Sequence, residues 1–163
     1  MILRHLFPSP IGLLSMTEEN GFITELSLRE AADIPGSFNP RCPSAAPGLE
    51  TELFRQAKKQ LGQYFAGQRR AFELPIRCQG TAFQLRVWNA LCEIPYGQTR
   101  SYQDIARSIQ SPKAVRAVGQ ANNRNPLIIL VPCHRVIHKN GGLGGYACGD
   151  QVKKFLLELE QGR

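Results

Sequence analysis

Cys133 and His134 stand side by side in the segment Pro132-Cys133-His134-Arg135-Val136. The thiolate is the reactive form of cysteine, and a neighbouring imidazole can take the proton of the thiol. Most free cysteines, however, pack in a core as small hydrophobic residues. An isolated Cys-His pair therefore indicates either a cysteine that packs in the core or a reactive thiol with its base, and the rest of the chain decides between these two interpretations.

The segment that leads into this pair is apolar. Residues 127–131, Leu-Ile-Ile-Leu-Val, are a short apolar run that ends at Pro132. Such a run predicts a buried strand, and a proline at its end stops the strand. The pattern thus predicts a cysteine held at the end of a buried strand, which is a position suited to chemistry.

Length and cysteine usage limit the classes of protein. With 163 residues the chain forms one compact unit or two small domains, and no apolar run approaches the roughly 20 residues that span a bilayer. The N-terminus lacks the layout of a signal peptide, so we expect a cytoplasmic or nuclear protein. The five cysteines are an odd number without a CxxC pair, which indicates neither a disulfide framework nor a zinc ribbon. We expect no metal and no cofactor.

The positive charge is concentrated in the second half of the chain. The net charge is +7; residues 1–80 hold nine Lys/Arg against eight Asp/Glu, whereas residues 81–163 hold eleven against five. A basic half of this kind is what a polyanionic partner requires, although many basic proteins bind no polyanion.

The first half of the chain predicts a small α+β unit. Asn20-Gly21 is a hairpin signal between alternating apolar segments, and Gly67 stops a run of helical periodicity that begins at Leu53. The proline-rich residues 35–48 indicate a loop. The predicted strands are Ile2–Phe7, Ile11–Met16, Phe22–Leu28 and Phe72–Cys78.

The second half predicts short helices. Thr81 caps the first of them, and Ser101 with Asp104 has the form of a capping box for the second, which runs through Ile109. Ser111-Pro112 is typical of an N-cap followed by a first-turn proline, which predicts a third helix from Lys113 to about Asn122. A final helix starts near Asp150, and its apolar stripe is predicted at Val152, Phe155, Leu156 and Leu159.

The two middle helices have the lengths and the turn of a helix-turn-helix. Small residues on the second helix allow a close approach to a surface, and Lys113, Arg116 and Gln120 supply donors for phosphates or bases. An ordinary αα-hairpin, with its alanines against a neighbouring helix, explains the same pattern. The position of this helix just before the reactive cysteine favours an enzyme that acts on a base taken out of the duplex.

An ordered set of motifs carries a resemblance to a known family. Residues 81–160 resemble the O6-alkylguanine-DNA alkyltransferases, which are direct-reversal DNA repair proteins. The residues that match are Phe83-x-x-x-Val87-Trp88, Ile94-Pro95-Tyr96-Gly97, Ser101-Tyr102, Lys113-x-x-Arg116-Ala117-Val118-Gly119, Asn125-Pro126, Ile129-x-Val131-Pro132-Cys133-His134-Arg135-Val136, Gly144-x-Tyr146 and Leu156-Leu157-x-x-Glu160. The first half resembles the family loosely, through Ser9-Pro10-Ile11-Gly12 and Tyr64-Phe65-x-Gly67.

The resemblance implies an α+β fold in two domains. Residues 1–78 would form a small ribonuclease H-like α/β domain, and residues 79–163 a mostly helical domain with the helix-turn-helix and the alkyl acceptor. The implied activity is the irreversible transfer of an alkyl group from O6 of guanine to the protein's own cysteine, once per molecule. The implied partner is double-stranded DNA that carries O6-alkylguanine, with O4-alkylthymine left open, bound by a monomer that is able to assemble cooperatively on DNA.

The resemblance also implies roles for individual residues. Cys133 would be the acceptor, His134 would activate it through a bridging water, and Glu160 would orient and charge-stabilise His134, as in a hydrolase triad. Asn125 would shape the turn that holds the thiol. Arg135 is interpreted as an ion-pair partner of structural importance.

Further roles concern DNA and the extruded base. Arg116 would enter the base stack through the minor groove, and Tyr102 would donate toward the leaving guanine or rotate its phosphate. The remaining predicted DNA-binding residues are Lys113, Ala114, Gln120, Ala121 and Arg124. The predicted walls of the base pocket are Val131, Val136, Tyr146 and Ala147.

Two residues depart from the pattern of the family. Ala147 and Cys148 follow the pocket tyrosine, where serine or glycine is common, so a donor to O6 is missing at Ala147 and a second thiol stands beside it. We interpret Cys148 as an incidental small residue. Two alternatives are an alkyltransferase-like protein that binds lesions without transfer, against which Cys133 argues, and a cysteine hydrolase built on Cys133, His134 and Glu160, which would not explain the basic half.

Overall fold

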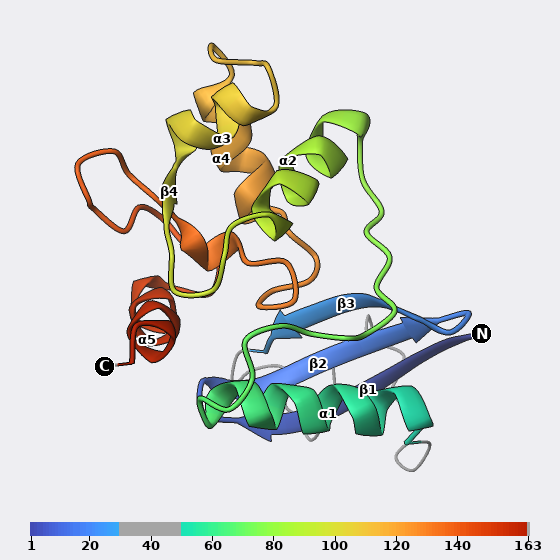
Figure 1. Cartoon of the computed structure of the whole chain (residues 1–163). Coiled ribbons are helices and arrows are strands. Elements are labelled where there is room, and N and C mark those ends of the chain that lie inside the picture. The colour runs from blue at the N-terminus through green and yellow to red at the C-terminus, as the bar shows by residue number, and fades with distance from the viewer. Residues whose placement is uncertain (30–49, 163) are drawn as a thin grey trace. The chain divides into compact units, whose positions relative to one another are not determined.

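The computed structural model describes residues 1–29 and 50–162. The chain divides into two units, Met1–Arg77 and Cys78–Arg163 (Figure 1). Cys42 and the loop predicted at residues 35–48 lie outside the described residues. None of the described helices is long and apolar enough to cross a membrane. The α+β class predicted from the sequence is confirmed, with strands mainly in the first unit and helices mainly in the second.

A three-stranded antiparallel sheet opens the first unit. The strands β1 (Ile2–Ser9), β2 (Gly12–Glu19) and β3 (Phe22–Leu28) pair in the order β1-β2-β3. Asn20 and Gly21 connect β2 to β3 with positive φ angles of 52° and 80°, the geometry that an Asn-Gly hairpin turn requires. The first three predicted strands are therefore confirmed, with β1 and β2 longer than expected.

A single helix completes the core of this unit. Helix α1 (Glu52–Phe65) is capped by the Thr51 side chain, which accepts from the Phe54 amide at 3.1 Å. His5 of β1 stacks on Phe54 with the ring centroids 5.3 Å apart. The buried residues of the helix and sheet form one apolar cluster that includes Leu14, Met16, Ile23, Leu26, Phe54, Ala57, Leu61 and Tyr64. Amphipathic periodicity in the sequence was sufficient to predict this helix.

The strand predicted at Phe72–Cys78 was wrong. Only Ile76 pairs there, in an isolated parallel bridge with Ile23, whose amide donates to Pro75 O at 2.9 Å. Pro75 itself has no amide hydrogen to continue a ladder, so the pairing stops after one bridge.

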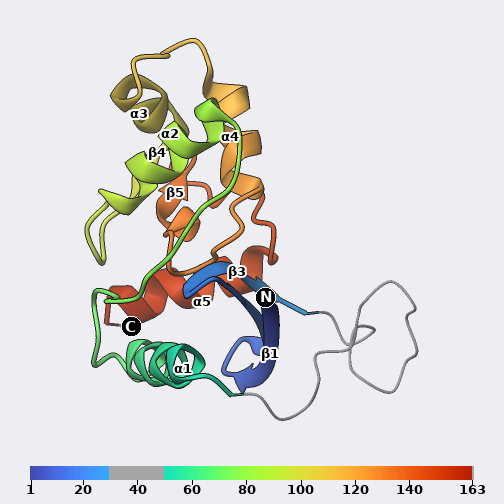
Figure 2. The same ribbon diagram turned by 90° about the vertical axis from the view of Figure 1, so that its right-hand side faces the viewer.

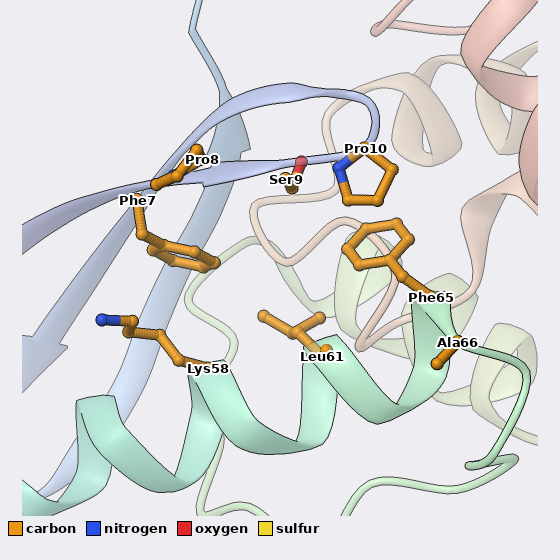
Figure 3. Close-up of a pocket in the computed structure, with 9 residues that line it drawn as sticks. Phe7, Pro8, Ser9, Pro10, Lys58, Leu61, Phe65 and Ala66 are labelled. Atoms are coloured by element: carbon orange, nitrogen blue, oxygen red, sulfur yellow. The ribbon is translucent and has the colours of Figure 1, made fainter.

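A hollow of about 410 Å³ lies between the β1–β2 hairpin and α1 (Figure 3). It is lined by Phe7, Pro8, Ser9, Pro10, Lys58, Leu61, Gly62, Phe65 and Ala66. These side chains are mostly apolar and include no cysteine, histidine or carboxylate, so this hollow brings no reactive group together. The chemistry lies in the other unit.

The second unit is a group of short helices. It contains α2 (Ala82–Cys92), α3 (Tyr102–Ser108), α4 (Val115–Asn123), the 3-10 helix η2 (Cys133–Arg135) and α5 (Asp150–Glu160), with β4 (Arg100–Ser101) parallel to β5 (Val136–Ile137). Figures 1 and 2 both show α2, α3 and α4 side by side. The predicted Thr81 cap of α2 and the predicted Ser101–Asp104 capping box of α3 are both present, and Gln84 completes a capping box at Thr81 that was not predicted.

The third predicted helix starts later than expected. Residues 111–114 form a turn, closed by a hydrogen bond from the Ala114 amide to Ser111 O at 2.9 Å, and α4 begins only at Val115. Ala114, not Ser111, is the N-cap, and it makes no side-chain capping bond. Ser111-Pro112 thus forms the turn between α3 and α4, and Lys113 lies in that turn.

The strand predicted at residues 127–131 was also wrong. The segment is buried as expected, but it contains only a bridge between Ile128 and Val131, and Ile129 adopts a φ of +69°. The Asn125 side chain bonds the Leu127 amide, Leu127 O and Val131 O, which satisfies backbone groups that a sheet would otherwise pair. A buried apolar run can therefore be a side-chain-bonded loop, and its composition alone does not reveal this.

The buried face of α5 differs from the predicted stripe. Leu156 is buried as predicted, but Phe155 is 38% exposed, while Lys153 and Glu160 are buried. Both polar side chains have specific partners in the second unit, so the buried face of α5 consists of Lys153, Leu156, Leu157 and Glu160 and not of the predicted apolar stripe. These partners are described with the site below.

We expect Trp88→Phe to destabilise the second unit by about 1–3 kcal/mol. The Trp88 indole Nε1 donates to Ala121 O at 2.8 Å and joins α2 to α4 in the core. The substitution removes this bond and part of a buried ring, while the Arg124 amide still donates to the same carbonyl at 3.2 Å. Urea unfolding followed by circular dichroism measures the change. A loss below about 0.5 kcal/mol, the range of ordinary surface substitutions, would contradict the assigned role.

Candidate active site

Cys133 begins the 3-10 helix η2 directly after Pro132. Its side chain is almost completely buried, and Sγ lies 3.8 Å from Tyr146 Oη. The predicted acceptor therefore occupies the start of a tight turn, and the predicted pocket residue Tyr146 lies against its sulfur.

Two asparagines hold the segment that carries the thiol. Asn125 Nδ2 donates to Val131 O at 2.8 Å, two residues before Cys133, and Asn122 Nδ2 donates to Cys133 O at 3.3 Å. Both side chains are buried, and Asn122 belongs to α4. Asn125 was predicted to shape this turn, whereas Asn122 was not predicted, because an asparagine near the end of a helix carries no distinctive sequence signal.

Glu160 accepts hydrogen bonds from two neighbouring residues. His134 Nε2 lies 2.7 Å from Glu160 Oε1, and the Arg135 guanidinium donates Nε to Oε2 and Nη2 to Oε1, each at 2.9 Å. Arg135 Nη1 also donates to Ile94 O at 2.7 Å. The predicted ion pair of Arg135 is therefore present, and the three residues form one buried cluster.

This cluster fixes the charge of its members. Burial raises the pKa of the Glu160 carboxyl, but hydrogen bonds from His134 and Arg135, together with the positive charge of the guanidinium, outweigh burial and bring the pKa to about 2. Burial lowers the pKa of His134, although Glu160 opposes that shift. A neutral imidazole that donates from Nε2 to a carboxylate leaves Nδ1 as its proton acceptor. His134 is thus prepared to act as a base.

The thiol is subject to opposing effects. Burial raises the pKa of Cys133, while hydrogen bonds from Asn125 and Tyr146 and the charge of Lys153 lower it. Burial is the largest of these effects, so the resting thiol is protonated and needs a base before it can attack.

Lys153 is a functional candidate that sequence reasoning missed. It is fully buried; Nζ donates to Val136 O at 2.6 Å and also to Leu143 O, and it lies 5.9 Å from the Tyr102 ring and 5.8 Å from the Tyr146 ring. A lysine in a helix is normally expected to be exposed, since most lysines are. The only sequence feature that indicated burial of Lys153 was its spacing of three residues from Leu156, which places both on one face of the helix.

Tyr102 and Arg116 meet at a hollow of about 440 Å³. Tyr102, the first residue of α3, is buried, and burial raises its pKa. Arg116, near the start of α4, is exposed. The lining residues come from α3, α4 and the loop after β5: Tyr102, Gln103, Val115, Arg116, Gly119, Asn123, His138, Lys139 and Gly145.

The other predicted DNA-binding residues divide by exposure. Lys113, Gln120 and Arg124 are exposed, and Ala114 is half-buried. Ala121 is buried, and its carbonyl accepts the hydrogen bond from the Trp88 indole, so its side chain packs in the core.

The predicted pocket residues likewise differ in exposure. Val131, Val136 and Tyr146 are buried, whereas Ala147 is exposed and Cys148 is a half-buried thiol. No group of three or more His, Cys, Asp or Glu side chains in residues 1–29 and 50–162 is placed to hold a metal ion.

Comparisons with known proteins place this arrangement in a family. Residues 2–78 match the model of the 6-O-methylguanine DNA methyltransferase ribonuclease-like domain, and residues 82–162 match the DNA binding domain of the same proteins. The chain therefore belongs to the O6-methylguanine-DNA methyltransferase family, and the predicted resemblance is confirmed.

Individual relatives cover nearly the whole chain. A methylated-DNA--protein-cysteine methyltransferase of Methanosarcina mazei is 57% identical over 96% of this chain and 96% of its own length. A constitutive enzyme of the same name from Bacillus subtilis is 49% identical over 94% and 92%. The crystal structure of Mycobacterium tuberculosis OGT in complex with DNA has a TM-score of 0.82 and 41% identity, over 98% of this chain and 92% of that one.

We expect the ion pair of Glu160 to make the second unit sensitive to acid. A carboxyl whose pKa falls from 4.5 to about 2 on folding contributes about 3 kcal/mol above pH 4.5, and this contribution is lost as the pH falls toward 2. Glu160→Gln should lower stability at pH 7 by about 3–5 kcal/mol, because Arg135 is left without its counter-charge. It should also flatten the pH dependence between 4.5 and 2.

Urea unfolding at pH 7, 4.5 and 2.5 measures both effects. The matched control is Glu158→Gln on the same helix, whose exposed pair with Lys154 is 3.9 Å long and should contribute less than about 1 kcal/mol. The assignment fails if Glu160→Gln retains the acid sensitivity of the wild type. Burial also lowers the pKa of His134, so the wild type and Glu160→Gln both lose further stability as the pH falls below 6.5.

We expect Lys153→Met to raise the pKa of Cys133, because the lysine charge favours the thiolate. The rate at which iodoacetamide modifies Cys133, followed by peptide mapping across a pH series, reports this pKa. Lys154→Met, the adjacent and largely exposed lysine, should leave the profile unchanged. An unshifted profile in a folded Lys153→Met protein would show that the charge does not act on the thiol.

Proposed function

We propose that Cys133 is the alkyl acceptor, and that its substrate is O6-alkylguanine extruded from double-stranded DNA. The family acts in direct-reversal DNA repair by transfer of an alkyl group to a cysteine of the protein. Cys133 is the candidate because it begins η2 beside a neutral, Glu160-bound His134 and lies in the unit that matches the DNA binding domain. This arrangement of thiol, base and carboxylate carries the proposal.

The reaction is an in-line displacement at the alkyl carbon. A bond forms between Cys133 Sγ and that carbon, and the bond between the carbon and O6 of guanine breaks. The electron pair of the broken bond goes to the guanine, which takes up a proton. The thioether does not return to a thiol by hydrolysis, so each molecule reacts once.

His134 supplies the base that the buried thiol needs. The proton of Cys133 passes through a bridging water to the Nδ1 acceptor of His134, and the imidazolium that forms is stabilised by Glu160. Glu160 remains ionised throughout, because the positive guanidinium of Arg135 binds both of its oxygens and balances their charge. The reaction therefore does not require protonation of the carboxylate.

The base reaches the thiol by leaving the duplex stack. Arg116 fills the space that the base leaves, and Tyr102 contacts the leaving nucleotide. These roles are supported by the position of both side chains in the lining of one hollow. Lys113, Gln120 and Arg124 are exposed donors for the DNA backbone. Buried Val131, Val136 and Tyr146 line the base pocket, and O4-alkylthymine is a second candidate substrate. We propose a monomer that assembles cooperatively on DNA.

The test is the intact mass of the protein after incubation with a duplex that contains one O6-methylguanine. We expect one added methyl group per molecule, placed on Cys133 by peptide mapping, and no second turnover with excess substrate. Cys133→Ser should gain no mass. A matched variant, Cys148→Ser, should react like the wild type.

Two results would overturn the proposal. Tight binding of the lesion duplex with an unchanged mass would make the protein a lesion-binding protein without transfer. A methyl group on Cys148 would move the acceptor to the neighbouring loop.

A further inference from the structure

His138 and Lys139 line the same hollow as Tyr102 and Arg116, yet neither has a part in the transfer described above. Both are exposed and follow β5 in the loop that leads to Tyr146. Of the two, His138 is in ring contact with a residue proposed to touch the extruded nucleotide.

His138 packs on Tyr102. The ring centroids are 5.4 Å apart, and the rings are tilted by 49°. Gly144 marks where their polar ends meet: a Cβ atom added there would lie 2.9 Å from His138 Nε2 and 3.1 Å from Tyr102 Oη. The two polar ends therefore face the same small region of space, which is kept open by a glycine with a φ of +70°.

The loop itself fixes the position of His138. Its amide donates to Gly142 O at 2.8 Å, and its carbonyl accepts from the Gly141 amide at 2.9 Å. The Asn140 side chain also accepts from the Gly142 amide at 2.9 Å. These bonds close a compact turn, so the imidazole is presented by an ordered backbone.

The charge around the hollow indicates the chemistry of its occupant. Arg116 and Lys139 place two positive side chains on the lining, and no carboxylate is among the lining residues. A lining of this kind suits an anion with acceptor oxygens, such as the phosphodiester of a nucleotide. The imidazole of His138 can donate from Nε2 to such an oxygen.

We infer that His138 is a further DNA-binding residue, which donates from Nε2 to the phosphodiester backbone of the extruded nucleotide beside Tyr102. The inference rests on the proposed function. Tyr102 and His138 then form a pair of donors that holds the backbone while the base lies in the pocket of Cys133. The contact exists only when the nucleotide has left the stack, so His138 favours damaged over undamaged DNA.

The test compares the affinities of two duplexes of the same sequence, one with O6-methylguanine and one undamaged. Cys133→Ser is the background, so that transfer does not deplete the complex. His138→Phe keeps a ring on Tyr102 and removes the donor, and His138→Ala removes both. Lys154→Ala is the control, since Lys154 is exposed on α5 and does not line the hollow.

We expect both His138 variants to bind the lesion duplex about tenfold more weakly, the effect of one hydrogen bond to a charged group, and to bind the undamaged duplex within about twofold of the parent. If His138→Phe binds like the parent, His138 only supports Tyr102 by packing. If both variants bind like the parent, the contact does not exist. Equal losses on both duplexes would show that His138 contacts unflipped DNA. Alkyl transfer by the otherwise unmodified protein tests the proposed function separately.

Discussion

The hydrogen bonding of the Glu160 carboxylate with His134 and Arg135 is the interaction on which the arrangement of the second unit depends. The carboxylate lies at the end of α5 and accepts from two consecutive residues of η2, so one side chain ties the last helix to the turn that carries the thiol. Arg135 provides the positive charge that keeps this carboxylate ionised inside the protein. Because Arg135 balances the charge of Glu160, His134 does not have to be protonated to do so and remains a neutral base. A histidine paired with a buried carboxylate alone would be pulled toward its charged form.

The thiol segment is held mainly by side chains and not by a sheet. Asn125 bonds three backbone groups of residues 127–131, the Leu127 amide and the carbonyls of Leu127 and Val131, and Asn122 donates to the carbonyl of Cys133 from α4. A strand in a sheet would fix the segment through a ladder of equivalent bonds and would turn alternate side chains to opposite faces. In the turn that follows this loop, His134 and Arg135 both reach Glu160, while Cys133 lies against Tyr146.

Local signals in the sequence were sufficient for much of this fold. The Asn-Gly hairpin, the periodicity of α1, the Thr81 cap and the Ser101–Asp104 capping box act within a few residues, and each was present as predicted. The errors arose where particular hydrogen bonds, and not propensity or periodicity, decide the conformation. The start of α4 follows a turn closed by Ala114 and Ser111, and the irregular segment at residues 127–131 is bonded by the nearby Asn125 side chain. The polar buried face of α5 depends on partners that are far along the chain. Lys153 and Asn122 were missed because only the tertiary structure shows that these side chains are buried and donate to carbonyls of other segments.

The near-complete burial of Cys133 has a consequence for the lifetime of the protein in a cell. A reagent that is consumed in a single reaction gains nothing from a thiol that reacts indiscriminately with peroxides or soluble electrophiles. Oxidation and adventitious modification both follow the exposure and the thiolate fraction of a cysteine. Under the proposed function, a sulfur that is covered and protonated at rest reacts only when an alkylated substrate reaches it and His134 takes its proton. The burial that makes the thiol harder to activate therefore also protects protein molecules that have not yet reacted.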